Sequence, residues 1–350
     1  MNKIVYILLA LFMMSCNSGH YNSVRINGLK YGEFYEDLLF ISPSIGLLGG
    51  YEDKHTYHWD SIRPKGFQNF DAICLRTIDG GKNWEKQKMD DGIVNGFTIK
   101  DGIIYASIQK SDSTYVSKTV IYTSNDQGKN WKKKCELDTL LVRLHVIDSN
   151  WIIGNTYGKL NETRDGGNTW NELKTNNFVW NEFYAEGYVY YFSDNNDGIF
   201  KTIVRRDLDS GHEREMPIPD NCEGTAGSGD IIFCRNNEEL RVYEIDDDFK
   251  FSYLYSFKKG GYMSAQFIGR HNEQIYLLIF SPRAGLFSLQ DCFYYSPDGG
   301  KEWIKLGRKG YIDSMGKRVS SYGDSTSFRL FFYKDIYSMG IFNFSNVIKK

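Results

Sequence analysis

One eight-residue pattern, Ser/Thr-x-Asp-x-Gly-x-x-Trp, occurs four times in this 350-residue chain. A hydroxyl residue, an aspartate, a glycine and a tryptophan keep the same spacing in every copy, while the residues between them vary. A pattern that returns every few tens of residues indicates a repeat architecture, in which each unit buries its apolar surface against its neighbours. The four copies are Thr77–Trp84, Ser124–Trp131, Thr163–Trp170 and Ser296–Trp303.

These segments resemble the Asp-box (BNR) repeats of β-propellers of the sialidase-like, sortilin-like and photosystem-assembly-factor-like types. Through the spacing of the copies, the resemblance extends over most of the mature chain. It implies an all-β fold of four-stranded antiparallel blades, in which each box joins the third strand of a blade to the fourth. It also implies that ligands bind on the face opposite the boxes.

The residue types of the repeat suit a tight turn. An aspartate carboxylate accepts hydrogen bonds from the N–H groups of a turn, and glycine adopts positive φ without a Cβ clash. Tryptophan supplies a large apolar surface that fixes the hairpin to its blade. We therefore assign a structural rather than a catalytic role to the repeated residues, which are Asp79, Trp84, Asp126, Trp131, Asp165, Trp170, Asp298 and Trp303.

The intervals between these aspartates predict the number of blades. They are 47, 39 and 133 residues, and the last equals about three steps of the length of a four-stranded blade. Two degenerate turns are therefore expected between the third and fourth copies, at Asp207–Gly211 and at Asp246–Asp248. With one further blade at the C-terminus, the sequence predicts a single propeller of seven blades, with six or eight as alternatives.

The last blade is expected to close the ring. Arg318–Tyr322, Phe328–Tyr333 and Tyr337–Phe344 have the pattern of three short strands, and Gly310–Met315 is expected to supply the inner strand. Tyr21–Leu29 precedes the first blade and is expected to pair with the last one, because closure removes exposed strand edges.

The N-terminus has the features of a targeting segment. Lys3 is followed by an apolar run over residues 4–14, which is too short to span a bilayer. The run ends at Ser15-Cys16 and resembles a lipobox, whose cysteine is lipidated and becomes the mature N-terminus. We expect a signal peptide over 1–15, a lipidated tether over 16–20 and the propeller over 21–350. An ordinary secretory signal is the alternative, and both predict export.

The residues after Cys16 refine the expected location. They are Asn17-Ser18-Gly19-His20 and contain no acidic run of the kind that serves as a surface-export signal in some bacterial lipoproteins. The membrane contact is therefore expected through the N-terminal lipid in the bacterial cell envelope. An anchor that faces the periplasm is favoured over the cell surface.

Charge and motifs argue against several classes of ligand. The 42 basic and 44 acidic residues are interspersed and give a net charge of −2, so no basic field selects nucleic acid. The sequence contains no Walker loop or dinucleotide fingerprint, and no cofactor is expected. His55 and His58 lack a third ligand at a suitable spacing, so no metal site is expected. The oligomeric state is left open.

The long connections between the second and third strands of a blade are the candidate binding loops, because a rigid scaffold positions loops for function. They run from Asp53 to Phe70, from Lys110 to Ser117 and from Ser281 to Gln290. Aromatic side chains beside arginine suit stacking on a sugar or contact with a protein, although they also fold loops onto their own blade. The predicted ligand-binding residues are Tyr57, Trp59, Arg63, Phe67, Arg283 and Phe287.

The catalytic signature of the sialidase-like enzymes is not recognisable. Such a site needs three arginines that bind the substrate carboxylate, a tyrosine nucleophile with a glutamate partner, and an aspartate that acts as the acid. The nearest match to the family's Arg-Ile-Pro motif is Ile62-Arg63-Pro64, which is out of order and lies inside the longest loop, while arginines such as Arg143 stand in no catalytic context. We expect no catalytic residues and favour a non-enzymatic envelope propeller that binds a protein or a glycan. A divergent sialidase-like or other glycoside hydrolase is the alternative.

Overall fold

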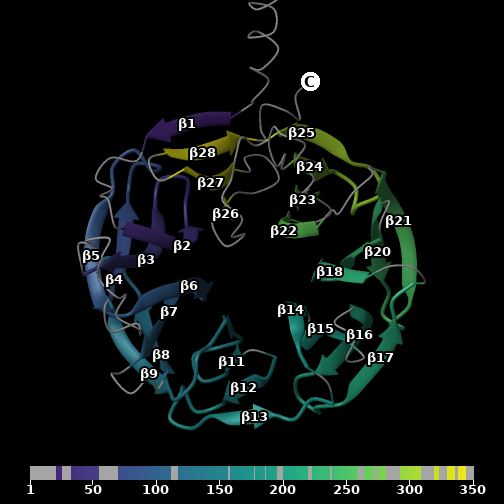
Figure 1. The fold of residues 1–350 in the computed structure, drawn as a ribbon, viewed down its shortest axis with the longest axis horizontal. Coiled ribbons are helices and arrows are strands. Elements are labelled where there is room, and N and C mark those ends of the chain that lie inside the picture. Colours follow the sequence, from purple (N-terminus) through teal and green to yellow (C-terminus); the bar gives the residue numbers. More distant parts are fainter. Residues whose placement is uncertain are drawn as a thin grey trace, which may run out of the picture.

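A computed structural model shows the β-sheets of the chain arranged in a ring (Figure 1). Within the residues that it describes, the strands form seven four-stranded antiparallel sheets. The predicted all-β propeller of four-stranded antiparallel blades is confirmed. The described residues are 21–25, 33–54, 70–111, 117–156, 158–176, 178–185, 187–194, 200–219, 223–236, 239–258, 264–271, 274–280, 292–308, 319–322, 329–335 and 338–343.

The first three blades follow the chain, each with its first strand nearest the ring axis and its fourth strand on the rim. Blade I contains β2 (Glu33–Phe40), β3 (Gly46–Asp53), β4 (Phe70–Thr77) and β5 (Glu85–Asp91). Blade II contains β6 (Ile93–Lys100), β7 (Ile103–Ser111), β8 (Ser117–Ser124) and β9 (Lys132–Leu137). Blade III contains β10 (Arg143–Val146), β11 (Ile152–Asn155), β12 (Leu160–Thr163) and β13 (Asn171–Leu173).

The next three blades have the same order of strands. Blade IV contains β14 (Trp180–Ala185), β15 (Tyr188–Asp194), β16 (Phe200–Asp207) and β17 (Glu213–Pro217). Blade V contains β18 (Glu223–Ser228), β19 (Ile231–Arg235), β20 (Glu239–Ile245) and β21 (Phe251–Lys258). Blade VI contains β22 (Ser264–His271), β23 (Gln274–Phe280), β24 (Cys292–Ser296) and β25 (Ile304–Arg308).

Blade VII combines the two ends of the chain. Its strands are β26 (Val319–Tyr322), β27 (Arg329–Asp335), β28 (Ser338–Asn343) and, on the outside, β1 (Tyr21–Arg25). The predicted closure by the N-terminal strand is thus confirmed. The expectation for Gly310–Met315 was wrong, because β1 supplies the fourth strand and the inner position belongs to β26, which contacts the inner strands β2 and β22.

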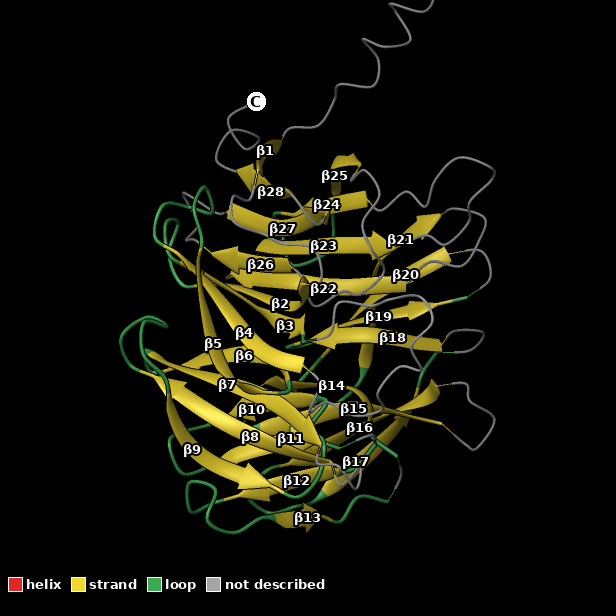
Figure 2. Ribbon diagram, turned by 60° about the vertical axis from the view of Figure 1, so that its left-hand side comes forward, coloured by secondary structure: helices red, strands yellow, loops and turns green. Residues whose placement is uncertain are grey.

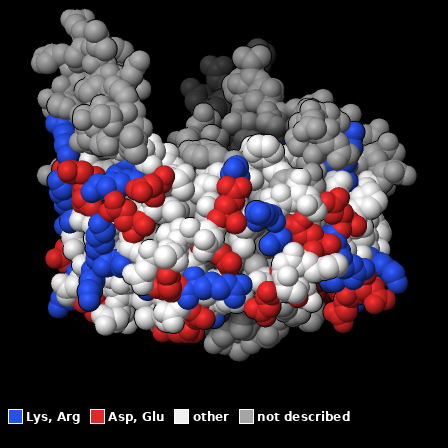
Figure 3. All heavy atoms as spheres, turned by 90° about the horizontal axis from the view of Figure 1, so that it is seen from below, with Lys and Arg blue, Asp and Glu red and all other residues white. Residues whose placement is uncertain are grey.

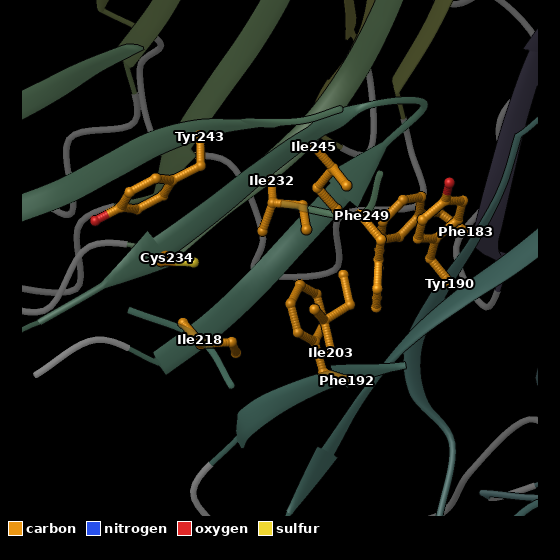
Figure 4. Packing of buried hydrophobic residues seen from close by; sticks show 10 residues of the cluster. All are labelled: Phe183, Tyr190, Phe192, Ile203, Ile218, Ile232, Cys234, Tyr243, Ile245 and Phe249. Carbon is orange, nitrogen blue, oxygen red and sulfur yellow. The ribbon is translucent and has the colours of Figure 1, made fainter. Parts of the chain in front are cut away.

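The hydrophobic core is divided among the seams between neighbouring blades. The cluster between blades IV and V, drawn in Figure 4, joins Phe183, Phe192 and Ile203 of one blade to Ile232 and Tyr243 of the next. Similar clusters join blades I and II, II and III, III and IV, and V and VI. Burial between twisted sheets therefore makes each blade depend on its neighbours.

The connections between strands divide the ring into two faces, and Figure 2 shows the strands running between them. The turns between first and second strands and between third and fourth strands share one face, which we call the Asp-turn face. The connections between second and third strands, and from each blade to the next, emerge on the other face, which we call the loop-rich face. All four repeats join a third strand to a fourth, as predicted.

The turns have the hydrogen bonds that their residue types predict. In the third repeat, the buried Thr163 hydroxyl donates to Asp165 and accepts from the N–H of Gly167, and Asp165 accepts from the N–H of Thr169. The other three repeats make the same three contacts, and the distances lie between 2.7 and 3.0 Å throughout. The aspartates therefore hold the turns together.

The tryptophan of each turn packs against buried apolar residues. Trp84, Trp131, Trp170 and Trp303 all contact hydrophobic clusters. The two degenerate turns lie where they were predicted, between β16 and β17 and between β20 and β21. They bury an apolar residue of another kind instead, and these residues are Leu208 and Phe249.

Candidate functional site

The longest predicted binding loop emerges from the loop-rich face of blade I, between β3 and β4. Four of the predicted ligand-binding residues, Tyr57, Trp59, Arg63 and Phe67, lie outside the described residues, and so do Arg283 and Phe287 between β23 and β24. Cys16 also lies outside them. The described strand ends beneath these loops show what the scaffold offers at this face.

An aromatic ladder stands at the base of the loop between β3 and β4. The rings of Phe34 and Tyr51 stack with their centroids 5.0 Å apart, and Tyr51 contacts Phe70 at 4.7 Å. These residues come from the first three strands of blade I, at the ends nearest the loop-rich face. Phe34 is 48% exposed, so the ladder presents an aromatic surface to solvent.

Charged side chains lie next to the residues of this ladder, at Lys54 directly after β3 and on β4 and β5. Lys54 contacts the carboxylates of Asp71 and Asp91 at 3.2 and 2.7 Å, and Lys88 contacts the same two at 2.7 and 3.1 Å. The hydrogen bonds from Lys54 and Lys88 lower the pKa of Asp91 to about 2. This network neutralises its own charges, and its exposed members contribute little stability, because solvent screens such pairs.

A second aromatic surface lies where blade III passes to blade IV. Phe178 and Trp180 are 56% and 42% exposed, respectively, at the start of the inner strand β14. Trp180 contacts Phe200 across the blade, with ring centroids 6.0 Å apart. Phe178 lies over Gly158 in the connection between β11 and β12. Both exposed rings are therefore held in place by the strands beside them.

A buried glutamate, Glu182, lies in the same strand as Trp180. The side chain of Glu182 is 2% exposed, and its carboxylate accepts a 2.7 Å hydrogen bond from the amide of Asn155. Arg143 donates to the backbone oxygen of Glu182 at 3.1 Å and lies 3.9 Å from its carboxylate. Asn181, with φ of +48°, precedes Glu182 at a β-bulge between β14 and β15. A bulge re-aims the side chains of a strand, and here it accompanies the burial of Glu182 in the seam.

Polar side chains of the inner strands connect each blade to the next. Asp37 accepts from the backbone N–H of Phe97 at 2.6 Å, which joins blade I to blade II. Asn95 donates to the carbonyl oxygens of Leu141 and Val142, which joins blade II to blade III. Arg143 has the same role between blades III and IV. These contacts give Asp37 and Arg143 a structural role near the axis.

The described residues give no support for a metal centre or a membrane-spanning helix. Among them, no group of three or more histidine, cysteine, aspartate or glutamate side chains is placed to hold a metal ion. In the same part of the chain, no helix is both long enough and apolar enough to cross a bilayer. Figure 3 shows basic and acidic side chains interspersed over the rim.

Sequence reasoning missed the surface around Phe178, Trp180 and Glu182. The connection before β14 is short, so a search for long insertions passes over it. The signal that was present is the alternation Phe178-Val179-Trp180. Val179 is buried in the core, and the aromatic residues on either side of it are exposed. Arg143 was noted as an isolated arginine, and only the fold shows what it contacts.

Comparison with known proteins supports the fold. No protein-family model matches the chain. It is 27% identical over 124 residues to photosystem II stability/assembly factor HCF136, chloroplastic, of Arabidopsis thaliana, a match that covers 33% of this chain and 30% of that protein. The structure of YCF48 from Cyanidioschyzon merolae is similar over 91% of this chain and 98% of that chain, with a TM-score of 0.55 and 14% identity.

A glycoside hydrolase is among the more distant neighbours. The GH93 α-L-arabinofuranosidase of Fusarium graminearum aligns over 94% of this chain and 100% of that chain, with a TM-score of 0.46 and 12% identity. At identities this low, a shared fold says nothing of a shared activity. The comparisons therefore establish a β-propeller.

Proposed function

We propose that this chain is a non-enzymatic binding or assembly propeller that holds a partner on its loop-rich face. The observation that carries the proposal is the exposure of large aromatic side chains at that face, at Phe34 in blade I and at Phe178 and Trp180 beside blade IV. Exposed aromatic residues on a rigid scaffold are typical of interaction surfaces. The long connections that leave the same face add the predicted loop residues to this surface.

A protein partner is favoured over a glycan. The relative with a described role, in Arabidopsis thaliana, is a stability and assembly factor, and the chain resembles part of it in sequence. The described inner-strand carboxylates also favour binding over catalysis, because Asp37 and Glu182 are engaged in contacts within and between blades. A glycosidase needs a pair of carboxylates that face a substrate across a pocket.

The proposed place of action is the cell envelope. Export by the N-terminal segment and lipidation of Cys16 would hold the propeller at the membrane, with periplasmic exposure favoured. Cys16→Ala is expected to release the protein from the membrane fraction into the soluble fraction while the propeller still folds. A variant that stays in the membrane fraction would show that another feature anchors the chain.

The binding proposal is tested with the soluble form that starts at Asn17. Phe178→Ala and Trp180→Ala, alone and together, are expected to weaken capture of an envelope partner by about tenfold or more when combined, as for central interface residues. Tyr253→Ala is the matched control, since Tyr253 is 59% exposed but lies on the rim strand β21. Equal capture by all variants would place the partner elsewhere.

Catalysis is tested in parallel with a glycan array and a panel of glycosides. Cleavage of one glycoside that disappears on Glu182→Gln, with the fold retained, would replace the scaffold proposal by a hydrolase. Glycan binding without turnover that is lost on Trp59→Ala would place the partner site on the loop between β3 and β4.

A further inference from the structure

The direction of β1 fixes where the N-terminal tether joins the ring. Strand β28 is the third strand of blade VII and therefore runs from the loop-rich face to the Asp-turn face, as the third strand does in every blade. Strand β1 pairs with it antiparallel, with Tyr21 opposite Phe342 and Arg25 opposite Ser338. Tyr21 consequently stands at the Asp-turn face, and Arg25 at the loop-rich face.

The tether is short compared with the depth of the ring. Five residue steps from Cys16 to Tyr21 span at most about 18 Å. The five residues of β1 extend over roughly 16 Å between the two faces. A lipid at Cys16 reaches a bilayer easily from the Asp-turn face. To bring the loop-rich face to the same bilayer, the tether would have to run back along β1 and use nearly its full length.

The Asp-turn face near this attachment point has the side chains of a bilayer contact. Ile78, in the Asp turn of blade I, is 64% exposed. The exposed Lys82 follows it in the same turn, and the exposed Lys129 lies in the corresponding turn of blade II. Blade I adjoins blade VII, because β2 contacts β26 and β27. An apolar residue flanked by lysines suits an anionic lipid surface.

The acidic residues of these turns, Asp79 and Asp126, are hydrogen-bonded within the turns themselves. The carboxylate of Asp79 accepts from the backbone N–H groups of Lys82 and Asn83 and from the Asn83 side chain. That of Asp126 accepts from the backbone and the side chain of Asn130. Both carboxylates are therefore turned toward their own turns, and the exposed residues Lys82 and Lys129 lie in the same two turns.

We infer that the Asp-turn face of blades VII, I and II lies against a lipid bilayer, so that the loop-rich face points away from it. The inference rests on the proposed lipid anchor at Cys16. It adds a second surface to the proposed function, because the membrane and the partner would be held on opposite faces of one rigid ring.

The test uses lysine labelling of the lipidated full chain in vesicles of phosphatidylethanolamine and phosphatidylglycerol. The soluble form that starts at Asn17, mixed with the same vesicles, is the reference. A water-soluble acylating reagent and mass spectrometry measure labelling at each lysine. We expect labelling of Lys82 and Lys129 to fall roughly threefold or more in the lipidated protein, as for side chains held in a lipid headgroup layer.

Lys159 is the internal control for the opposite face. It lies in the connection between β11 and β12, and its side chain is 57% exposed. Its labelling should not change on membrane attachment. Ile78→Asp in the lipidated protein should restore part of the labelling of Lys82, because it removes the apolar contact and adds a like charge to an anionic surface.

Two results would overturn the inference, and a third would overturn its premise. Equal labelling of Lys82 and Lys129 in both forms, or selective protection of Lys159, would reject the orientation while the vesicle-bound protein still confirmed the anchor. Full-length protein with an unmodified Cys16 would instead reject the anchor. The two failures are thus distinguished by the mass of the N-terminal peptide.

Discussion

The imidazole ring of His145 and the phenol ring of Tyr184 lie 3.7 Å apart and almost parallel, although they belong to the inner strands of different blades. Burial, with a smaller contribution from the charge of Lys100, lowers the pKa of His145 to about 4. The ring is therefore neutral at neutral pH, and its contact with Tyr184 helps to join blades III and IV.

This stacking predicts a specific loss of stability in acid. Because the pKa of His145 is lower in the folded protein than its usual value, the unfolded chain binds the proton first as pH falls. The contribution of His145 to stability is fully present above about pH 6.5 and is lost as the pH falls toward about 4. Because the ring is partly exposed, we expect a loss of about 2 kcal/mol, less than the difference in pKa alone would give. Urea unfolding of the soluble form at a series of pH values measures the change.

Two histidine variants identify the source of this acid loss. His145→Phe keeps a ring against Tyr184 and should flatten the stability curve between about pH 6.5 and 4. His212→Gln alters an exposed side chain in the turn after β16 and should leave the curve as it is. A His145→Phe curve identical to the parent's would show that this ring does not cause the loss.

The aspartates of the turns titrate in a lower pH range than His145. Asp126 and Asp165 have pKa values of about 2, because turn N–H groups bind their carboxylates, so their contribution to stability is lost only below about pH 4.

The hydroxyl of Thr163 is expected to matter more than its size suggests. It is fully buried, and it accepts from the N–H of Gly167 and donates to Asp165. Thr163→Val keeps the shape but leaves a buried N–H without an acceptor, which costs about 1–3 kcal/mol. Ser210→Ala, which removes an exposed hydroxyl from the degenerate turn of blade IV, should cost less than about 0.5 kcal/mol. Urea midpoints of the two variants provide the comparison.

Two glycines separate backbone strain from packing. Gly167 and Gly187 have φ values of +102° and +83°, respectively. A Cβ on Gly167 would lie 2.3 Å from the Sγ of Cys135, whereas one on Gly187 would have no atom within 4 Å. Gly187→Ala should therefore cost about 1 kcal/mol and Gly167→Ala about 3 kcal/mol or more. Similar losses in the two variants would mean that the neighbouring strand moves aside.

Removal of β1 should open the ring. Without residues 17–25, β28 loses its antiparallel partner and becomes an unprotected edge. We expect a lower midpoint of thermal unfolding and concentration-dependent association, measured by calorimetry and size-exclusion chromatography. A variant that lacks only residues 17–20 is the control and should match the parent. A truncated ring that stays monomeric and equally stable would show that β1 is dispensable.

Much of the fold could be predicted because the turn motif is local. Asp165 and its partners lie within a few residues of one another, so sequence alone determines their hydrogen bonds. The degenerate turns were located by spacing, but their packing was not. Phe249 replaces the tryptophan in blade V, and it does so with a φ of +63°, which side chains of this size rarely adopt.

The site was harder to predict because it depends on contacts between blades. Arg143, Asn155 and Glu182 come from three strands and two blades, and no spacing in the sequence relates them. The inner strand of blade VII was misassigned for a similar reason. The choice between Gly310–Met315 and β26 is decided by the pairing of β1 with β28, which are more than 300 residues apart.

Because of that pairing, the first and the last strand of the ring are neighbours in one sheet. Strand β1 is synthesised more than 300 residues before β28 and must wait for it. Non-local pairing of this kind slows folding, because a long loop must close before any contact is gained. The other six sheets contain neither β1 nor β28, so closure of the ring is a separate, late step that can follow only after the last strand has been made.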